Sequence, residues 1–149
     1  MTEIYNNLVN ILDDLIINTG AKNALLITED GIVIAGNSQQ NDNNHEVNYN
    51  FAAISASILS MAERGIEIIN SNKILEQIKI DAGMDENLDQ DFSILITRVI
   101  SNILIQLIFP KTINIGLIQF EVNNTIKKIK DIIKKDTSRA LFTNIGSLL

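Results

Sequence analysis

The sequence predicts an α/β fold of the α+β sandwich type, in which a five-stranded antiparallel sheet lies between helices. Three long stretches carry apolar residues at three- and four-residue spacing, which is typical of amphipathic helices. Five short runs rich in Ile, Leu and Val have the length of strands, and two pairs of runs are joined by very short connections. Because several runs are apolar on consecutive positions, we expect helices on both faces of the sheet.

Composition and charge exclude several kinds of site. The chain has 149 residues, which favours one domain, and no cysteine, which excludes disulfides, thiolate catalysis and cysteine-bound zinc. Its only histidine, His45, cannot form a paired-histidine zinc site. The net charge of −6 and the aromatic content of 5% disfavour nucleic acid as a partner. Signal regions and apolar runs of roughly 18 residues are absent, so we expect a cytoplasmic protein without membrane insertion.

The first element is predicted to be an amphipathic helix from Thr2 to Thr19. Its apolar positions recur at helical spacing, at Ile4, Leu8, Ile11, Leu12, Leu15 and Ile16. Thr2 is suited to cap the start of this helix, and Gly20 is well placed to end it.

Residues 30–38, DGIVIAGNS, resemble the nucleotide-binding P-loop but have an asparagine in place of its lysine. Without the ammonium group, the stretch lacks the charge that contacts the β- and γ-phosphates. Residues 32–35 favour a strand of their own because they are mostly β-branched. Together with the run Ala24–Thr28 and the intervening Asp-Gly pair, they predict a tight hairpin in which Gly31 takes a positive φ. We therefore expect no nucleotide binding by the chain alone.

The second predicted helix runs from Phe51 to Ile69, after a polar connection at residues 36–46 that we expect to be a solvated loop. Its apolar stripe contains Phe51, Ile54, Ile58, Met61 or Ala62, and Ile69. Its small residues Ala52, Ala53, Ser55, Ala56 and Ser57 form a flat flank. Such a flank allows either the close approach of another helix or packing on the chain's own sheet.

Three further strands are predicted after this helix. The first, Lys73–Asp81, has the alternating pattern of a half-buried strand. The acidic residues 81–91 that follow do not match an EF-hand loop, so we expect a solvated turn. Phe92–Ile100 and Ile103–Pro110 should pair antiparallel, because only two residues separate them.

The last predicted helix carries Ile115, Ile118, Val122, Ile126, Ile129 and Ile133 on one stripe. Its lysines lie on the solvent side and near the C-terminal end, where they complement the helix dipole. We place the domain at residues 1–135 and treat residues 136–149 as a C-terminal tail, apolar enough to dock on this body or on a partner.

In this order, the elements resemble the Roadblock / dynein light chain domain family. The resemblance rests on ALLITEDGIVIAG, FAAISASILSMAERGIEII and NIGLIQFEV, which hold the hairpin, the alanine-rich central helix and the step that opens the last helix. It covers the chain from Thr2 to Lys135. The long Asn-rich connection, the acidic turn and the apolar tail depart from the family pattern.

The resemblance implies a homodimer, or a heterodimer with a Roadblock paralogue, in which the central helices pack across a two-fold axis and the third strands join two sheets. It also implies a scaffold that regulates a Ras-like small GTPase, with GTPase activation as one form of regulation. The candidate dimer-interface residues are Ile54, Ser57, Ile58, Met61, Leu75, Gln77 and Lys79. The candidate GTPase contacts are Glu63 and Arg64. Independently of the family, a third strand at a sheet edge invites pairing with another chain.

Three classes of function stay open: a non-enzymatic dimeric adaptor or GTPase-activating partner, which leads, a PAS/profilin-like sensor of a small ligand, and an enzyme in its own right. A motor or cytoskeletal adaptor without nucleotide-state sensing is an alternative to the GTPase regulator. An enzyme is disfavoured because paired histidines, serine elbows and glycine-rich phosphate loops are absent, and we expect no cofactor or metal. An arginine finger would have to be Arg64, Arg98 or Arg139. Arg98 stands among isoleucines in a predicted strand, which favours a paired structural charge.

Overall fold

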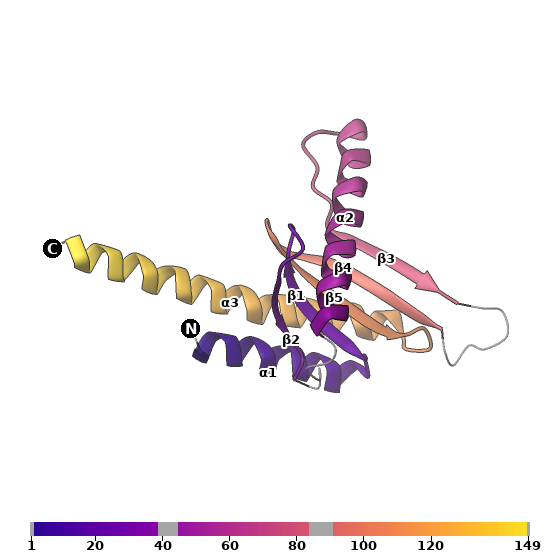
Figure 1. The fold of residues 1–149 in the computed structure, drawn as a ribbon, viewed down its shortest axis with the longest axis horizontal. Helices are drawn as coiled ribbons and strands as arrows, with labels where there is room; N and C mark the ends of the chain where they lie inside the picture. Colours follow the sequence, from indigo (N-terminus) through magenta and orange to yellow (C-terminus); the bar gives the residue numbers. More distant parts are fainter. Residues whose placement is uncertain (1, 39–44, 84–90, 149) are drawn as a thin grey trace.

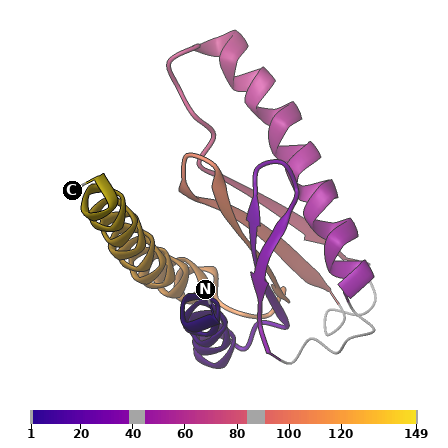
Figure 2. The same ribbon diagram turned by 60° about the vertical axis from the view of Figure 1, so that its left-hand side comes forward.

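The computed structural model describes residues 2–38, 45–83 and 91–148, and within them it has the predicted sandwich architecture. The elements are α1 (Thr2–Thr19), β1 (Asn23–Thr28), β2 (Val33–Gly36), α2 (His45–Ile69), β3 (Gln77–Ala82), β4 (Phe92–Ile100), β5 (Ile103–Pro110) and α3 (Ile115–Leu148). The strands form one antiparallel sheet in the order β2-β1-β5-β4-β3. α1 and α3 lie side by side on one face, and α2 lies on the other (Figures 1 and 2). β2 and β3 are therefore the sheet edges, which confirms the predicted edge position of the third strand.

The hairpin between β1 and β2 is confirmed, and its turn requires glycine. The N–H of Thr28 donates to the carbonyl of Ile32 at 2.8 Å, which leaves residues 29–31 in the loop. Gly31 has a φ of +90°, in the left-handed region that residues with a Cβ rarely adopt. Gly20, with a φ of +80°, ends α1 as predicted.

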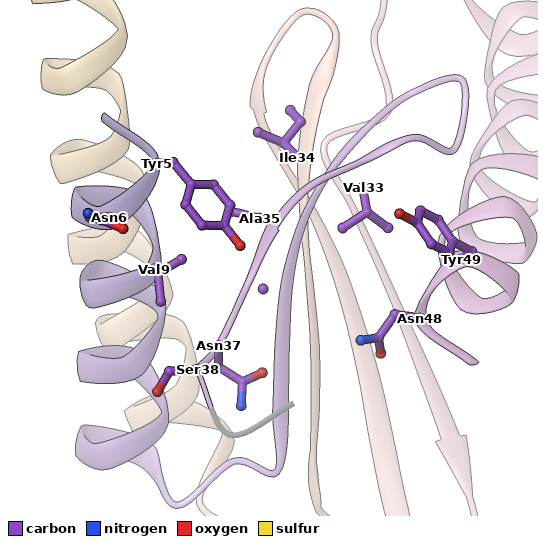
Figure 3. A pocket seen from close by; sticks show the side chains of 11 residues that line it. Tyr5, Asn6, Val9, Val33, Ile34, Ala35, Asn37, Ser38, Asn48 and Tyr49 are labelled. Atoms are coloured by element: carbon purple, nitrogen blue, oxygen red, sulfur yellow. The ribbon is translucent and has the colours of Figure 1, made fainter. Parts of the chain in front are cut away.

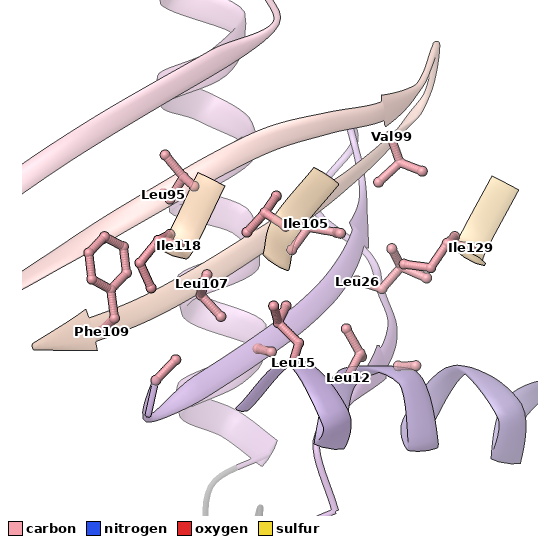
Figure 4. Close-up of a cluster of buried hydrophobic side chains, with 14 of the residues drawn as sticks. Leu12, Leu15, Leu26, Leu95, Val99, Ile105, Leu107, Phe109, Ile118 and Ile129 are labelled. Atoms are coloured by element: carbon pink, nitrogen blue, oxygen red, sulfur yellow. The ribbon is translucent and has the colours of Figure 1, made fainter. Parts of the chain in front are cut away.

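A large apolar core fills the space between the sheet and the helices α1 and α3 (Figure 4). Leu12 and Leu15 from α1 and Ile118 and Ile129 from α3 reach it from the helix side. Its buried members are Leu8, Leu12, Leu15, Ala21, Ala24, Leu26, Ala35, Leu95, Val99, Ile105, Leu107, Phe109, Ile118, Val122 and Ile129. The predicted apolar stripe of α1 therefore faces this core, and so does that of α3 apart from Ile115, which is 41% exposed.

The face under α2 carries a smaller apolar cluster. Its buried members are Leu25, Ile27, Ala52, Leu59, Ile96 and Leu104, and Val33, Leu75, Ile78 and Ile94 pack against them while partly buried. Leu25 and Ile27 lie in this cluster, whereas Leu26 between them lies in the large core. β1 is thus buried on both faces, as its unbroken apolar run predicts.

The predicted start of the second helix is wrong. α2 begins at His45, so residues at the end of the predicted polar loop are helical instead. Asn48 shows why polarity misled the prediction, because this residue is buried and accepts a hydrogen bond from Nδ2 of Asn23 at 3.4 Å. The rest of that loop, residues 39–44, and most of the acidic turn, residues 84–90, lie outside the described residues.

The predicted start of the third strand is also wrong, since β3 begins at Gln77 rather than Lys73. The carbonyl of Leu75 accepts a hydrogen bond from Nε of Arg98 at 3.0 Å, a side-chain contact. The main-chain N–H of Arg98 still donates to the carbonyl of Glu76, so the chain departs from the sheet before Glu76.

α3 is a continuous helix that begins with a side-chain cap. Oδ1 of Asn114 accepts a hydrogen bond from the N–H of Gly116 at 2.7 Å, which satisfies one of the free donors of the first turn. The predicted boundary between residues 135 and 136 falls inside this helix. Among the described residues, none of the helices combines the length and the apolar character needed to cross a membrane.

Candidate interaction surface

The hairpin turn packs directly against α2. A Cβ placed on Gly31 would lie 3.0 Å from Cα of Ala53 and 3.4 Å from Cβ of Ala56. Ala52, on the same flank, is fully buried. Ala52, Ser55 and Ala56 of the small-residue flank thus pack on the chain's own sheet and hairpin, whereas Ala53 and Ser57 are exposed.

A different side of α2 is apolar and exposed. Ile54 and Met61 expose 55% and 71% of their surface, and they stand two helical turns apart on the same side. Ser57 lies between them, is exposed, and donates its hydroxyl to the carbonyl of Ala53 at 2.9 Å. Ile58, beside this line, is half-buried. The four α2 residues predicted for a dimer interface thus form one surface strip.

β3 offers main-chain groups along the open edge of the sheet. The N–H of Arg98 donates to the carbonyl of Glu76 at 2.8 Å, just before the strand begins. Because hydrogen-bonded positions alternate in an antiparallel ladder, Gln77 and Lys79 direct their main-chain groups away from β4. No described strand lies beyond β3. These outward N–H and C=O groups can pair with another chain.

On the face of the sheet that α1 and α3 cover, side chains of β3 bind to one another and to side chains of β4. Oε1 of Gln77 accepts a hydrogen bond from Oγ1 of Thr97 at 3.1 Å, and Nζ of Lys79 lies 3.2 Å from a carboxylate oxygen of Asp81. The hydroxyl of Ser93 donates to Asp81, and this bond, aided by Lys79, lowers the pKa of the Asp81 carboxyl below its usual 3.8.

Leu75 does not lie on the edge strand, which corrects its predicted placement there. It precedes β3, is half-buried, and packs against the smaller apolar cluster under α2. Among the predicted dimer residues, Gln77 and Lys79 are therefore the two that lie on β3.

Arg98 joins four segments of the chain at one end of the sheet. Its side chain is only 11% exposed. Nε donates to the carbonyl of Leu75, Nη1 donates to the carbonyl of Ser101, Nη2 binds the carboxylate of Glu63, and Nη1 lies 3.5 Å from Oε2 of Glu29. We call these five residues the Arg98 cluster. The prediction of a paired structural charge is confirmed.

The two predicted GTPase contacts have different surroundings. Glu63 is bound to Arg98, and its side chain is 31% exposed. Arg64 is exposed and lines a shallow hollow of about 420 Å³ between α2 and the hairpin, together with Asp30 and Ser60. Arg64 is free to meet a partner, whereas Glu63 would first have to leave Arg98.

The arrangement of helices and strands is similar to that of several solved structures, although comparisons of sequence find no match. No protein-family model and no curated protein matches the sequence. MglB from Myxococcus xanthus superposes with a TM-score of 0.72 and 16% identity, over 88% of this chain and 90% of that one. The gliding protein MglB from Thermus thermophilus gives 0.71 and 17%, over 89% and 92%. A Roadblock/LC7 domain from Streptomyces avermitilis gives 0.69 and 11%, over 85% and 97%.

The chain has the Roadblock/LC7 fold. At these low identities the likeness concerns the fold, and it confirms the architecture that the hairpin, central helix and last-helix motifs predicted. In this Roadblock fold, α2 and β3 carry the exposed strip and the open edge described above.

One polar pair inside the Roadblock fold was missed from sequence. Ser55 on α2 donates its hydroxyl to Oε1 of Gln106 on β5 at 3.0 Å, and both residues are buried. Nε2 of Gln106 has no hydrogen-bond partner among the described residues. A glutamine inside the apolar run ILIQLIFP was the available signal, because a polar residue in a central strand needs a buried partner.

The stretch that resembles a P-loop contributes strand β2 to the sheet of this Roadblock fold. The N–H of Asn37 donates to the carbonyl of Ala24 at 3.2 Å, and Oδ1 of Asn37 accepts from the N–H of Ala24 at 3.2 Å. Asn37 thus continues the β1–β2 pairing where a P-loop has its lysine. That the chain alone binds no nucleotide stays a prediction.

A second hollow, of about 510 Å³, lies where α1, β2 and the beginning of α2 meet (Figure 3). Tyr5 from α1 and Tyr49 from α2 stand on either side of β2, and both are more than half exposed. All of the described lining side chains are uncharged, so within the described residues the hollow offers no cationic group to neutralise a phosphate. Within residues 2–38, 45–83 and 91–148, no three metal-binding side chains come together.

Proposed function

We propose that this Roadblock-fold chain is a dimeric regulator that works by binding a Ras-like small GTPase and performs no catalysis of its own. The observation that carries the proposal is that two elements expose groups suited to protein binding: α2 has an exposed apolar strip, and β3 has an open strand edge. Exposed apolar side chains such as Ile54 and Met61, and strand edges without a neighbouring strand, are both features of surfaces that bind protein.

A second copy of the chain suits both features. A two-fold axis beside β3 would pair the β3 edges of two copies antiparallel and bring their α2 helices together. MglB, which shares the fold, has been solved in a tetrameric arrangement. The interface should bury at least the standard ~1,600 Å² in total.

The GTPase part of the proposal rests on the family resemblance and on Arg64. Gliding protein MglB shares the fold, and the resemblance to Roadblock domains implies a GTPase partner. Arg64 stands exposed on α2, where a charge can guide association and fix the register of a partner. A dimer presents this surface twice, so one GTPase bound near the axis can block the second site.

The edge of β3 is tested by Gln77→Pro, with Gln77→Ala as the matched control. Both changes remove the side-chain bond to Thr97, but only proline removes the outward N–H. Sedimentation analysis should show weaker dimerisation for the proline variant than for the alanine variant. Light scattering that reports a monomer for the unaltered protein at tens of micromolar would refute the dimer.

The GTPase partner is tested with Ras-like GTPases encoded in the same genome, each loaded with GDP or a non-hydrolysable GTP analogue. We expect tighter binding to the GTP form, because a binder senses nucleotide state only through segments that the γ-phosphate orders. Arg64→Glu should weaken this binding, and Lys127→Glu, a reversal at an exposed lysine on α3, should not.

Equal binding in both nucleotide states would favour an adaptor without nucleotide sensing. An unchanged affinity for Arg64→Glu, with the dimer intact, would show that the contact site lies elsewhere.

A further inference from the structure

The Arg98 cluster reaches both elements that carry the proposed dimer surface. On α2 it binds Glu63, two positions after Met61 of the apolar strip. Beside β3 it holds the main chain of Leu75 and Glu76, immediately before Gln77. The guanidinium of Arg98 therefore connects Glu63 on α2 with Leu75 just before β3, although Glu63 and Arg98 stand 35 residues apart in sequence.

Apolar packing holds the C-terminal part of α2 only weakly. Ile68 and Ile69 expose 87% and 83% of their surface, so they add little buried area. Ser55 anchors the helix to Gln106, but Glu63 lies two turns further along. Between Leu59 and the end of α2, the bond from Glu63 to Arg98 is thus the strongest described link to the sheet, since hydrogen bonds between charged groups are roughly twice as strong as neutral ones.

The chemistry at this point requires arginine. Nε, Nη1 and Nη2 each donate to a different segment, and only a planar guanidinium offers donors in these fixed directions. Lysine would keep the charge but place it on a single nitrogen.

We propose that Arg98 is a positioning residue that sets the angle between α2 and β3 and thereby determines the affinity of the chain for a second copy. Because the side chain of Arg98 is largely buried, it acts through α2 and the chain before β3. This inference rests on the proposed dimer.

The first arm of the test compares Glu63→Gln with Glu67→Gln. Both remove one carboxylate from α2, one turn apart, but Glu67 is exposed and has no described partner. Sedimentation equilibrium should give a dimer dissociation constant about tenfold higher for Glu63→Gln, which corresponds to ~1.4 kcal/mol, and an unchanged value for Glu67→Gln.

The second arm compares Arg98→Lys with Lys127→Arg, an exchange of one cation for another at an exposed position on α3, and adds the double variant Arg98→Lys/Glu63→Gln. Arg98→Lys should weaken the dimer at least as much as Glu63→Gln, whereas Lys127→Arg should not. The double variant should be no weaker than Arg98→Lys alone, because both changes break the same contact.

Amide hydrogen exchange separates positioning from general loss of stability. Residues 63–77 should exchange faster in Glu63→Gln, while α1 and the first half of α3 keep their protection. Faster exchange everywhere, or an intact dimer with an unchanged dissociation constant, would overturn the inference.

A monomeric unaltered protein would overturn the proposed dimer, and with it the effect on affinity. The exchange measurement would then still decide whether Arg98 joins α2 to the beginning of β3, because it needs no second copy.

Discussion

The two faces of the sheet are built differently. On the α1/α3 face, two helices bury a large core of leucine, isoleucine and phenylalanine side chains (Figure 4). On the other face, α2 lies on a smaller cluster and is fixed by alanines, the Ser55–Gln106 bond and the Arg98 cluster. One face is held by buried apolar area, and the other by a few specific contacts.

Because of this difference, one face of the sheet provides most of the folding stability and the other is available for binding partners. Apolar burial is non-directional and provides most of the folding free energy, whereas hydrogen bonds fix orientation at a small net gain. The first face can therefore stabilise the chain, while the second keeps α2 in a defined position and leaves its apolar strip exposed. The second face is the one suited to binding partners.

Two leucines on β5 allow the largest test of this comparison. Leu107 faces the large core and Leu104 faces the cluster under α2, and both are completely buried. Leu107→Ala should reduce the free energy of unfolding by ~3–5 kcal/mol, and Leu104→Ala by only ~2 kcal/mol, because a smaller cluster collapses more easily around a cavity. Urea unfolding measures both, and equal losses would contradict the difference between the faces.

Two glycines with positive φ give the next test. An alanine at position 20 would meet Cδ1 of Ile113 at an ordinary 3.5 Å, so Gly20→Ala should cost only the backbone strain of ~1–2 kcal/mol. Gly31→Ala should cost more, because its Cβ also presses on the main chain of Ala53 at 3.0 Å. Thermal unfolding of both variants, measured side by side, would contradict the close contact between hairpin and helix if Gly20→Ala were the more harmful.

The buried Ser55–Gln106 pair should show a smaller effect. Ser55→Ala alone leaves the amide of Gln106 without its partner and should cost ~1–2 kcal/mol. Ser55→Ala combined with Gln106→Leu should recover most of that loss, since it also removes the unpaired Nε2. If the double variant were the less stable of the two in urea unfolding, the pair would contribute to stability more than to orientation.

The smallest expected effect concerns Asp81 at the edge strand. Its pKa is lowered by the hydrogen bond from Ser93, so this stabilisation is present above pH 3.8 and is lost as the pH falls through the lower folded-state value. Ser93→Ala should raise the pKa of Asp81 toward 3.8, as followed by NMR titration of its carboxyl carbon. A pKa that stays low would assign the shift to Lys79.

Most of the fold follows from local patterns. The hairpin was predictable because an Asp-Gly pair between two apolar runs has few other conformations, and α1 because its stripe has an unbroken helical period. The start of α2 was not predictable, since buried Asn48 resembles a loop residue until its partner Asn23 is known. Spacing within a segment carries no information about such long-range pairs.

The candidate site was predictable in part for the same reason. The strip at Ile54, Ser57 and Met61 follows from helical spacing. Other contacts depend on how strands and helices are stacked. Glu63 binds a side chain 35 residues away, and Ser55 binds a glutamine 51 residues away. Sequence spacing could identify Arg98 as a paired charge but could not identify its partners.

The length of α3 has a practical consequence. At 1.5 Å per residue its 34 residues span roughly 50 Å, whereas the 18 residues of α1, which runs alongside in the opposite direction, span roughly 27 Å. The first turn of α1 and the last turn of α3 both lie on the side of the sheet opposite α2 (Figures 1 and 2). A fluorophore or surface tether attached at either end would leave the α2 side unobstructed. At the C-terminal end, the length of the α3 helix would set the distance of the label from the sheet.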